Sequence, residues 1–189
     1  MRLVTTLAAL LMAAPAFAAD EFTPALQAYM DDEISDWANA PEIVAAIKAQ
    51  NEAHAGLSQT QIDEMDQAWR ASVGSPSNAP IAPVLNNPVS DALRARIEAS
   101  MGAMTEVFIM DEHGLNVAAS AVTSDMWQGD EAKFQDTYGK GAGSVHISEV
   151  ELDESTQRYQ GQISVTIVDP DTGAPIGALT VGVDAESLL

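Results

Sequence analysis

The sequence contains no cysteine, only 8 lysine and arginine residues, and aromatic side chains at 5% of its positions. Without cysteine no disulfide can form, so the stability of the fold must come from its hydrophobic core. The basic residues are outnumbered by 28 aspartates and glutamates, which gives a net charge of −20. A surface this negative argues against nucleic acid and anionic membranes as partners.

A long apolar run occurs only at the N-terminus of the sequence. Arg2 precedes an apolar stretch from Leu3 to Ala14, and the small-x-small tripeptide Ala16-Phe17-Ala18 follows. These features are typical of a secretory signal peptide. A membrane anchor would need about 20 apolar residues, and Asp20 closes the run too early. We therefore predict a signal peptide over residues 1–18, export to the periplasm, and no membrane insertion after cleavage.

The rest of the chain suits a single domain whose character changes near residue 104. Residues 19–103 have a helical pattern, and residues 104–189 have a strand pattern. Thr23 before Pro24 predicts a helix start. Leu26, Met30 and the later Ile34 and Trp37 then recur at three- and four-residue spacing, which indicates one buried helical face. Pro41 should break or restart this helix.

Three further signals divide the helical region. Ser58 and Gln61 have the spacing of a capping box, which predicts a helix start at this point. The segment 74–88 contains four prolines and several small polar residues, so we expect an extended connection over the surface. Ser90 is the predicted cap of the last helix before the strands.

Five strands are predicted from alternating apolar residues, over 106–110, 115–120, 144–152, 158–168 and 175–184. The alternation slips near Ser148, which favours a bulge. The run from Asp169 to Gly173 is a hairpin turn signal. The last three strands should form an antiparallel meander. The predicted fold class is α+β, with the N-terminal helices packed on a five-stranded antiparallel sheet.

The polar segment after the second predicted strand is the first candidate site. It places Trp127 beside Ser124, Asp125, Gln128 and Asp130. A flat apolar wall with donors and acceptors around it is typical of a pocket for a polar ligand. The same indole could instead fill the core where the strand passes into the next helix, and composition does not separate the two.

The short helix predicted after this segment contains a lysine and a tyrosine of interest. Lys133 could bind a ligand carboxylate. The alternative, which we favour, is a solvated lysine paired with Glu131 or Asp136. Phe134 and Tyr138 lie four residues apart and should face inward together, so the tyrosine hydroxyl is a candidate pocket group.

Catalytic and metal-binding patterns have little support. His54, His113 and His146 are far apart and no cysteine accompanies them, so a zinc site is not indicated. Asp169 and Asp171 alternate in the turn at 169–173, but Gly173 and Ala174 stand where a calcium-binding EF-hand loop needs an oxygen ligand and a glycine. Ser120 has no nucleophile-elbow glycines around it, although it could in principle join His146 and an aspartate in a triad. We predict no enzyme, no metal and no cofactor.

Several short motifs in the strand region carry a resemblance to a known family. They are Val107 to Asp111 with Gly114, Val117 to Ser120, Asp125 to Gly129, and Val168-Asp169 with Gly173, Pro175 to Gly177 and Leu179. With the preceding helices and the signal peptide, they make the chain similar to extracytoplasmic PAS-like sensor domains of the single Cache type, also called PDC. The resemblance implies a Cache-like sheet with a small-molecule pocket on its concave face. The segment after the second strand and the short helix near 130–138 would border that pocket.

These considerations give one functional hypothesis and one alternative. We predict a periplasmic sensor module that binds a small polar metabolite and is read by a membrane-bound receptor or kinase. Because the sequence stops at Leu189, we expect it to have no output domain of its own. The predicted ligand-binding residues are Ser120, Ser124, Asp125, Trp127, Gln128, Asp130, Lys133, Tyr138 and Asp169. The alternative is a constitutive protein–protein interaction module whose pocket is filled by side chains.

Overall fold

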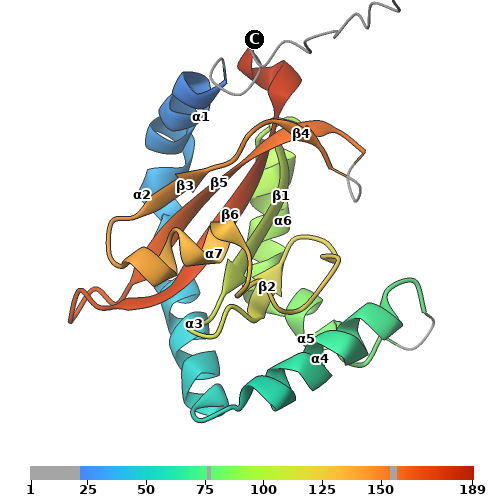
Figure 1. Cartoon of the computed structure of the whole chain (residues 1–189). Helices are drawn as coiled ribbons and strands as arrows, with labels where there is room; N and C mark the ends of the chain where they lie inside the picture. The colour runs from blue at the N-terminus through green and yellow to red at the C-terminus, as the bar shows by residue number, and fades with distance from the viewer. Residues whose placement is uncertain (1–21, 76–77, 154–156) are drawn as a thin grey trace, which may run out of the picture.

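The N-terminal helices form a layer against one face of an antiparallel sheet (Figure 1). The structure, a computed structural model, describes residues 22–75, 78–153 and 157–189. The predicted signal peptide over 1–18 lies outside the described residues. Among those residues, no helix combines the length and the apolar character needed to cross a membrane.

The first helical region begins with α1 (Thr23–Tyr29) and continues through a π-helical turn, η1 (Met30–Ile34), into α2 (Ser35–Ala38). The four apolar residues of the predicted stripe, from Leu26 to Trp37, are all buried, as expected. The predicted cap was one residue off, because Phe22 holds the cap position and Thr23 is the first helical residue. Pro41 does start a new helix, α3 (Pro41–His54).

The middle of the chain contains α4 (Gln59–Ser72), which begins with the predicted capping box. The Ser58 hydroxyl accepts from the backbone N–H of Gln61, and the Gln61 side-chain oxygen accepts from Ser58 N at 3.0 Å. Figure 1 shows α4 below the sheet, beyond the end of α3.

Two predictions for the following segment were wrong. The expected extended connection contains the short helix α5 (Ala82–Leu85), because Ile81 and Val84 find an apolar surface and are buried there. The next helix, α6 (Pro88–Ala99), is capped by Asn87, whose side chain accepts from Ser90 N at 2.9 Å. Ser90 is therefore not the cap. It lies inside the helix, fully buried, and donates its hydroxyl to the Val84 carbonyl at 2.6 Å.

The sheet confirms the predicted α+β class and has six strands in the described residues, arranged in the order β2-β1-β6-β5-β3 with β4 also paired to β5. The strands are β1 (Met104–Met110), β2 (Asn116–Ala119), β3 (Val145–Ile147), β4 (Glu151–Leu152), β5 (Tyr159–Val168) and β6 (Pro175–Asp184), and all pairs are antiparallel. The predicted strand 144–152 is thus broken in two near Ser148. There the Ser148 hydroxyl accepts from Gln162 N at 2.8 Å.

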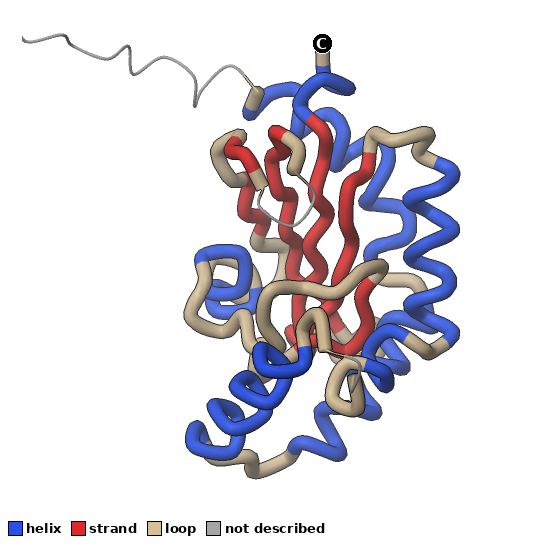
Figure 2. Tube along the Cα trace, turned by 90° about the vertical axis from the view of Figure 1, so that its right-hand side faces the viewer, coloured by secondary structure: helices blue, strands red, loops and turns tan. Residues whose placement is uncertain are grey.

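The two faces of the sheet differ in chemistry. Val107, Ile163 and Val181 point into a large hydrophobic core shared with α1, α2, α3 and α6. Side chains point alternately to the two faces of a strand, so Glu106 and Gln162 lie on the opposite face, and both are in register with Gly182. Figure 2 shows the strands with helices along one side and the loop-rich segment 120–144 across the other.

That loop-rich segment, which we call the lid (residues 120–144), covers part of the second face. It contains α7 (Ala132–Gln135) and the 3₁₀ turn η2 (Tyr138–Lys140). Met126 and Phe134 of the lid join Trp69 of α4 and Phe108 of β1 in a second hydrophobic core. The lid is therefore packed between the sheet and α4.

Candidate functional site

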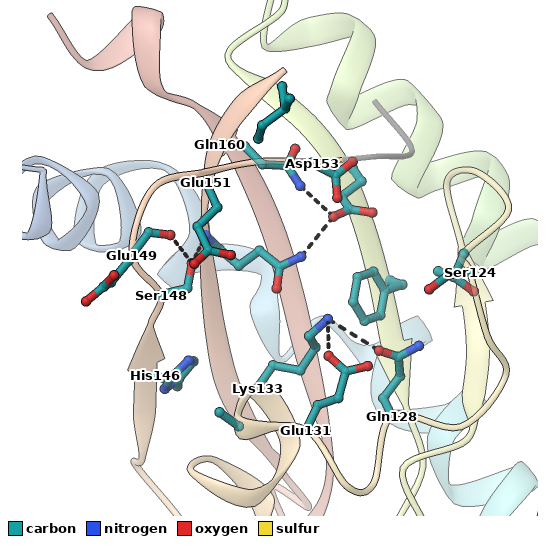
Figure 3. A pocket seen from close by; sticks show the side chains of 16 residues that line it. Ser124, Gln128, Glu131, Lys133, His146, Ser148, Glu149, Glu151, Asp153 and Gln160 are labelled. Atoms are coloured by element: carbon teal, nitrogen blue, oxygen red, sulfur yellow. Dashed lines mark hydrogen bonds and ion pairs between the residues drawn. The ribbon is translucent and has the colours of Figure 1, made fainter. Parts of the chain in front are cut away.

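A cavity of about 460 Å³ lies where the lid leaves the second face of the sheet uncovered. Its floor is formed by β1 and β5, one wall by the lid between Thr123 and Lys133, and the other wall by the stretch from His146 to Asp153 (Figure 3). Its size lies within the range of about 300–1,000 Å³ usual for small-molecule sites. Within the part of the chain that the structure describes, this cavity is the candidate ligand-binding site.

A carboxylate held by two amides occupies the floor of this cavity. Glu106 Oε1 accepts from Gln160 Nε2 at 2.9 Å and from Gln162 Nε2 at 3.0 Å. Glu106 is on β1 and both glutamines are on β5, so the side chains meet across β6, the strand between them. Gly182 of β6 permits this contact, because a Cβ there would lie 2.8 Å from Glu106 Cγ.

The environment of Glu106 raises its pKa. Burial is the largest cause, and the neighbouring Asp153 carboxylate adds to it. The amide bonds from Gln160 and Gln162 and the charge of Lys133 lower the pKa, but they do not outweigh burial. The ionised form of Glu106 therefore has less stabilisation in this cavity than it would have in water.

Lys133 lines the cavity and is paired within it. Its Nζ lies 2.9 Å from Glu131 Oε2 and donates to Gln128 Oε1 at 3.4 Å, as Figure 3 shows. The same ammonium sits 5.4 Å from the centre of the Phe108 ring. The pairing with Glu131 is the one we favoured from the sequence, but the side chain is only 15% exposed, so it is not a solvated surface lysine.

Gln128 lines the cavity too, and it is only 2% exposed. Its amide donates to the Asp125 carboxylate, which also accepts from Arg70 Nη2 at 3.0 Å. Burial, followed by the charge of Glu131, raises the pKa of Asp125. Ser124 is an exposed lining residue at the rim. Of the predicted ligand-binding residues, the structure thus brings Ser124, Gln128 and Lys133 to the cavity, with Asp125 directly behind its wall.

The indole of Trp127 does not line the cavity. Its Nε1 donates to the His113 carbonyl at 2.8 Å, which fixes the lid to the turn after β1. The ring also lies against Gly129, and it packs on the second hydrophobic core. Of the two interpretations left open by the sequence, core packing is the one that fits this geometry.

The other predicted ligand-binding residues also lie elsewhere. Ser120 Oγ accepts from Val107 N at 2.9 Å, Tyr138 stacks on Phe134 with ring centres 5.1 Å apart, and Asp130 is exposed. Asp169 pairs with Lys48 at 3.0 Å in the turn between β5 and β6. Asp169 follows Gln162 by seven residues and Gln160 by nine along β5, which is roughly 23–30 Å.

The hypothetical triad of Ser120 and His146 is not assembled. Ser120 follows β2 and His146 is on β3, and these strands lie at opposite edges of the sheet. Four strand spacings separate them, which is about 19 Å. His146 lies at the cavity, and its Nδ1 is 3.5 Å from Asp136 Oδ2. In the described parts of the chain, no three histidine, aspartate or glutamate side chains are arranged to hold a metal ion.

Helix α4 holds the lid from the side away from the cavity. Asp66 Oδ1 accepts from Met126 N at 2.9 Å and from Trp127 N at 3.1 Å. Trp69 Nε1 donates to the Thr123 carbonyl at 2.9 Å. Sequence reasoning did not find these contacts, nor the group of Glu106, Gln160 and Gln162. A usable signal for the glutamines was their place at the start of a polar alternation on β5, which Ser164 and Thr166 continue.

Comparisons with known proteins give solved sensor domains as similar structures. One is the ligand-binding domain of the Campylobacter jejuni chemoreceptor Tlp3 in complex with 4-methylisoleucine, with 14% identity, a TM-score of 0.44, and coverage of 78% of this chain and 57% of that one. Another is the sensor domain of the V. cholerae histidine kinase DctB, with 12% identity, a TM-score of 0.40, and coverage of 86% and 56%.

A third is the ligand-binding domain of the Pseudomonas aeruginosa amino acid chemoreceptor PctC in complex with GABA, with 14% identity, a TM-score of 0.38, and coverage of 78% and 58%. The chain therefore spans between half and three fifths of the length of these three domains. Each is a sensor or ligand-binding domain of a chemoreceptor or a histidine kinase. No family model matches the sequence, and no curated protein matches it.

Proposed function

We propose that this chain is an extracytoplasmic sensor module of the single Cache type, whose cavity between the sheet and the lid reversibly binds a small polar metabolite. The observation that carries the proposal is the cavity itself, about 460 Å³ in volume and lined mainly by polar side chains. The alternative of a constitutive interaction module required a pocket filled by side chains. The open cavity therefore favours the sensor.

The mechanism we propose uses the two-sided construction of the site. The floor belongs to the sheet, and the wall with Gln128 and Lys133 belongs to the lid. A ligand that contacts both would favour the conformation in which they are closest, and only to the extent of its differential affinity for that state. A membrane-bound receptor or kinase in the periplasm would read the change.

A ligand screen with an obstructed cavity tests the proposal. Amino acids, amines, organic acids and purines would be added to the purified protein, and thermal unfolding would be followed. We expect a stabilising compound, and we expect Ala132→Trp to abolish the effect, because Ala132 is an exposed residue that lines the cavity. Ala45→Trp, at an exposed position of α3, is the matched control and should still respond.

Two results would contradict the proposed function. One is the absence of any stabilising compound across all four classes. The other is a compound that stabilises wild type and the obstructed variant equally, because it would then bind outside the cavity.

A further inference from the structure

The charged side chains around the cavity are mostly acidic. The lining includes five carboxylates, which are Glu106, Glu131, Glu149, Glu151 and Asp153. Lys133 and His146 are the only lining residues among those described that carry or can take a positive charge. Lys133 is already paired with Glu131 at 2.9 Å. A molecule that enters the cavity therefore meets an excess of negative charge.

Glu106 is held in a fixed position on the floor. Gln160 and Gln162 both donate to Oε1, so the carboxylate is oriented by two neighbours on another strand. Because residue 182 is a glycine, no Cβ occupies the space that the Glu106 side chain needs. A carboxylate can accept about four hydrogen bonds through its two oxygens, so Glu106 keeps capacity for a donor that comes from the cavity.

The electrostatics of the floor favour such a donor if it is positively charged. Burial and the Asp153 carboxylate raise the pKa of Glu106 in spite of two amide donors and Lys133. Lys133 thus compensates the ionised carboxylate only in part. An opposite charge within about 4–6 Å favours the charged form of a carboxylate, and an anion at the same place would be repelled.

We infer that the cavity takes an organic cation of the aliphatic amine class, and that Glu106 binds its ammonium group. This inference rests on the proposed function. An ammonium brings three N–H donors and no acceptor, which matches a floor that offers carboxylate oxygen. Glu149 and Glu151 lie in the wall across from the lid, so an aliphatic ligand with a second amine meets a second acidic region.

Calorimetric titration with four-carbon probes of different charge tests the inference. Putrescine, 1,4-butanediol and succinate have the same chain length and carry two positive charges, no charge and two negative charges. In about 150 mM salt, we expect putrescine to bind and the other two not to bind. Glu106→Gln should weaken putrescine at least tenfold, because a hydrogen bond to a charged group is lost. Thermal unfolding would show that this variant is folded.

Asp171→Asn is the matched control. It removes the same charge from an exposed position in the turn between β5 and β6, outside the cavity. It should change the putrescine affinity less than twofold. An equal loss in both variants would overturn the inference, because attraction by the overall negative charge would then explain binding.

The other outcomes separate this inference from the proposed function. If succinate or another anion binds and Ala132→Trp abolishes its binding, the amine class is wrong and the sensor proposal stands. If calcium chloride alone stabilises the protein as much as putrescine does, the site takes cations in general and the inference falls. If no compound of any class binds, the inference and the proposed function fail together.

Discussion

Asp66→Ala should release the lid from α4. In the wild type, one carboxylate oxygen accepts from the amides of Met126 and Trp127 at 2.9 and 3.1 Å. A buried donor left without an acceptor costs about 1–3 kcal/mol. Because Trp127 is only part-buried and water can reach it in part, we expect a total loss of about 2–4 kcal/mol in the free energy of unfolding. Urea denaturation would measure this loss.

Thermal unfolding and hydrogen exchange would localise the effect. A loss of this size in a chain of 150–250 residues lowers Tm by roughly 5–15 °C. The two amides should also exchange faster than in the wild type. Asp66→Asn keeps an oxygen acceptor, so its loss should be smaller. Asp63→Ala, which removes an exposed carboxylate of the same helix, should cost less than about 0.5 kcal/mol. Equal losses for Asp66→Ala and Asp63→Ala would refute the reasoning.

Three more predictions concern the sheet and the lid. Gly177→Ala should cost about 1–3 kcal/mol or more in urea denaturation, because a Cβ at this position would overlap the Met110 carbonyl. Glu106→Gln should raise the free energy of unfolding at pH 7. Burial raises the pKa of Glu106, so ionisation of this side chain destabilises the native state. This gain should shrink as the pH falls from neutral toward about 4 in a series of urea curves. Trp69→Phe should cost about 1–3 kcal/mol in the same assay, because the Thr123 carbonyl loses its donor.

Each of these changes has a control or a contradicting result. Gly139→Ala should be nearly neutral, because the nearest heavy atom to its Cβ would be 3.8 Å away. Asp171→Asn should not reproduce the pH-dependent gain of Glu106→Gln. A Glu106→Gln variant that is less stable than the wild type at pH 7 would show that the amide network outweighs burial. A Trp69→Phe variant as stable as the wild type would show that the bond to Thr123 is replaced by water.

Periodic patterns predicted the elements of the fold well, because each pattern reflects a face that must be buried. The stripe from Leu26 to Trp37 is buried throughout, and the last strand has the predicted bounds 175–184. The segment 74–88 was misjudged because its prolines indicate a loop, while Ile81 and Val84 are buried by contacts with distant residues.

The site was harder to predict because its central group is assembled from separate strands. Glu106 and Gln162 are 56 residues apart in sequence, and they meet only because β6 lies between their strands with Gly182 in register. No local pattern contains this register. The composition around Trp127 correctly marked a polar segment beside the cavity. It could not show that the indole bonds to the His113 carbonyl and faces away from the cavity.

The lid and α4 contribute to one hydrophobic core and α1, α2, α3 and α6 to another, and the cavity opens beside the strands that join them. A guest molecule that contacts Glu106 and Gln128 together would tie these two cores to each other. Loss of the guest would then weaken the coupling between the half with α4 and the half with α1 and α3. The degree to which the two halves melt as one unit would thus report occupancy, even for a compound whose chemical identity is unknown.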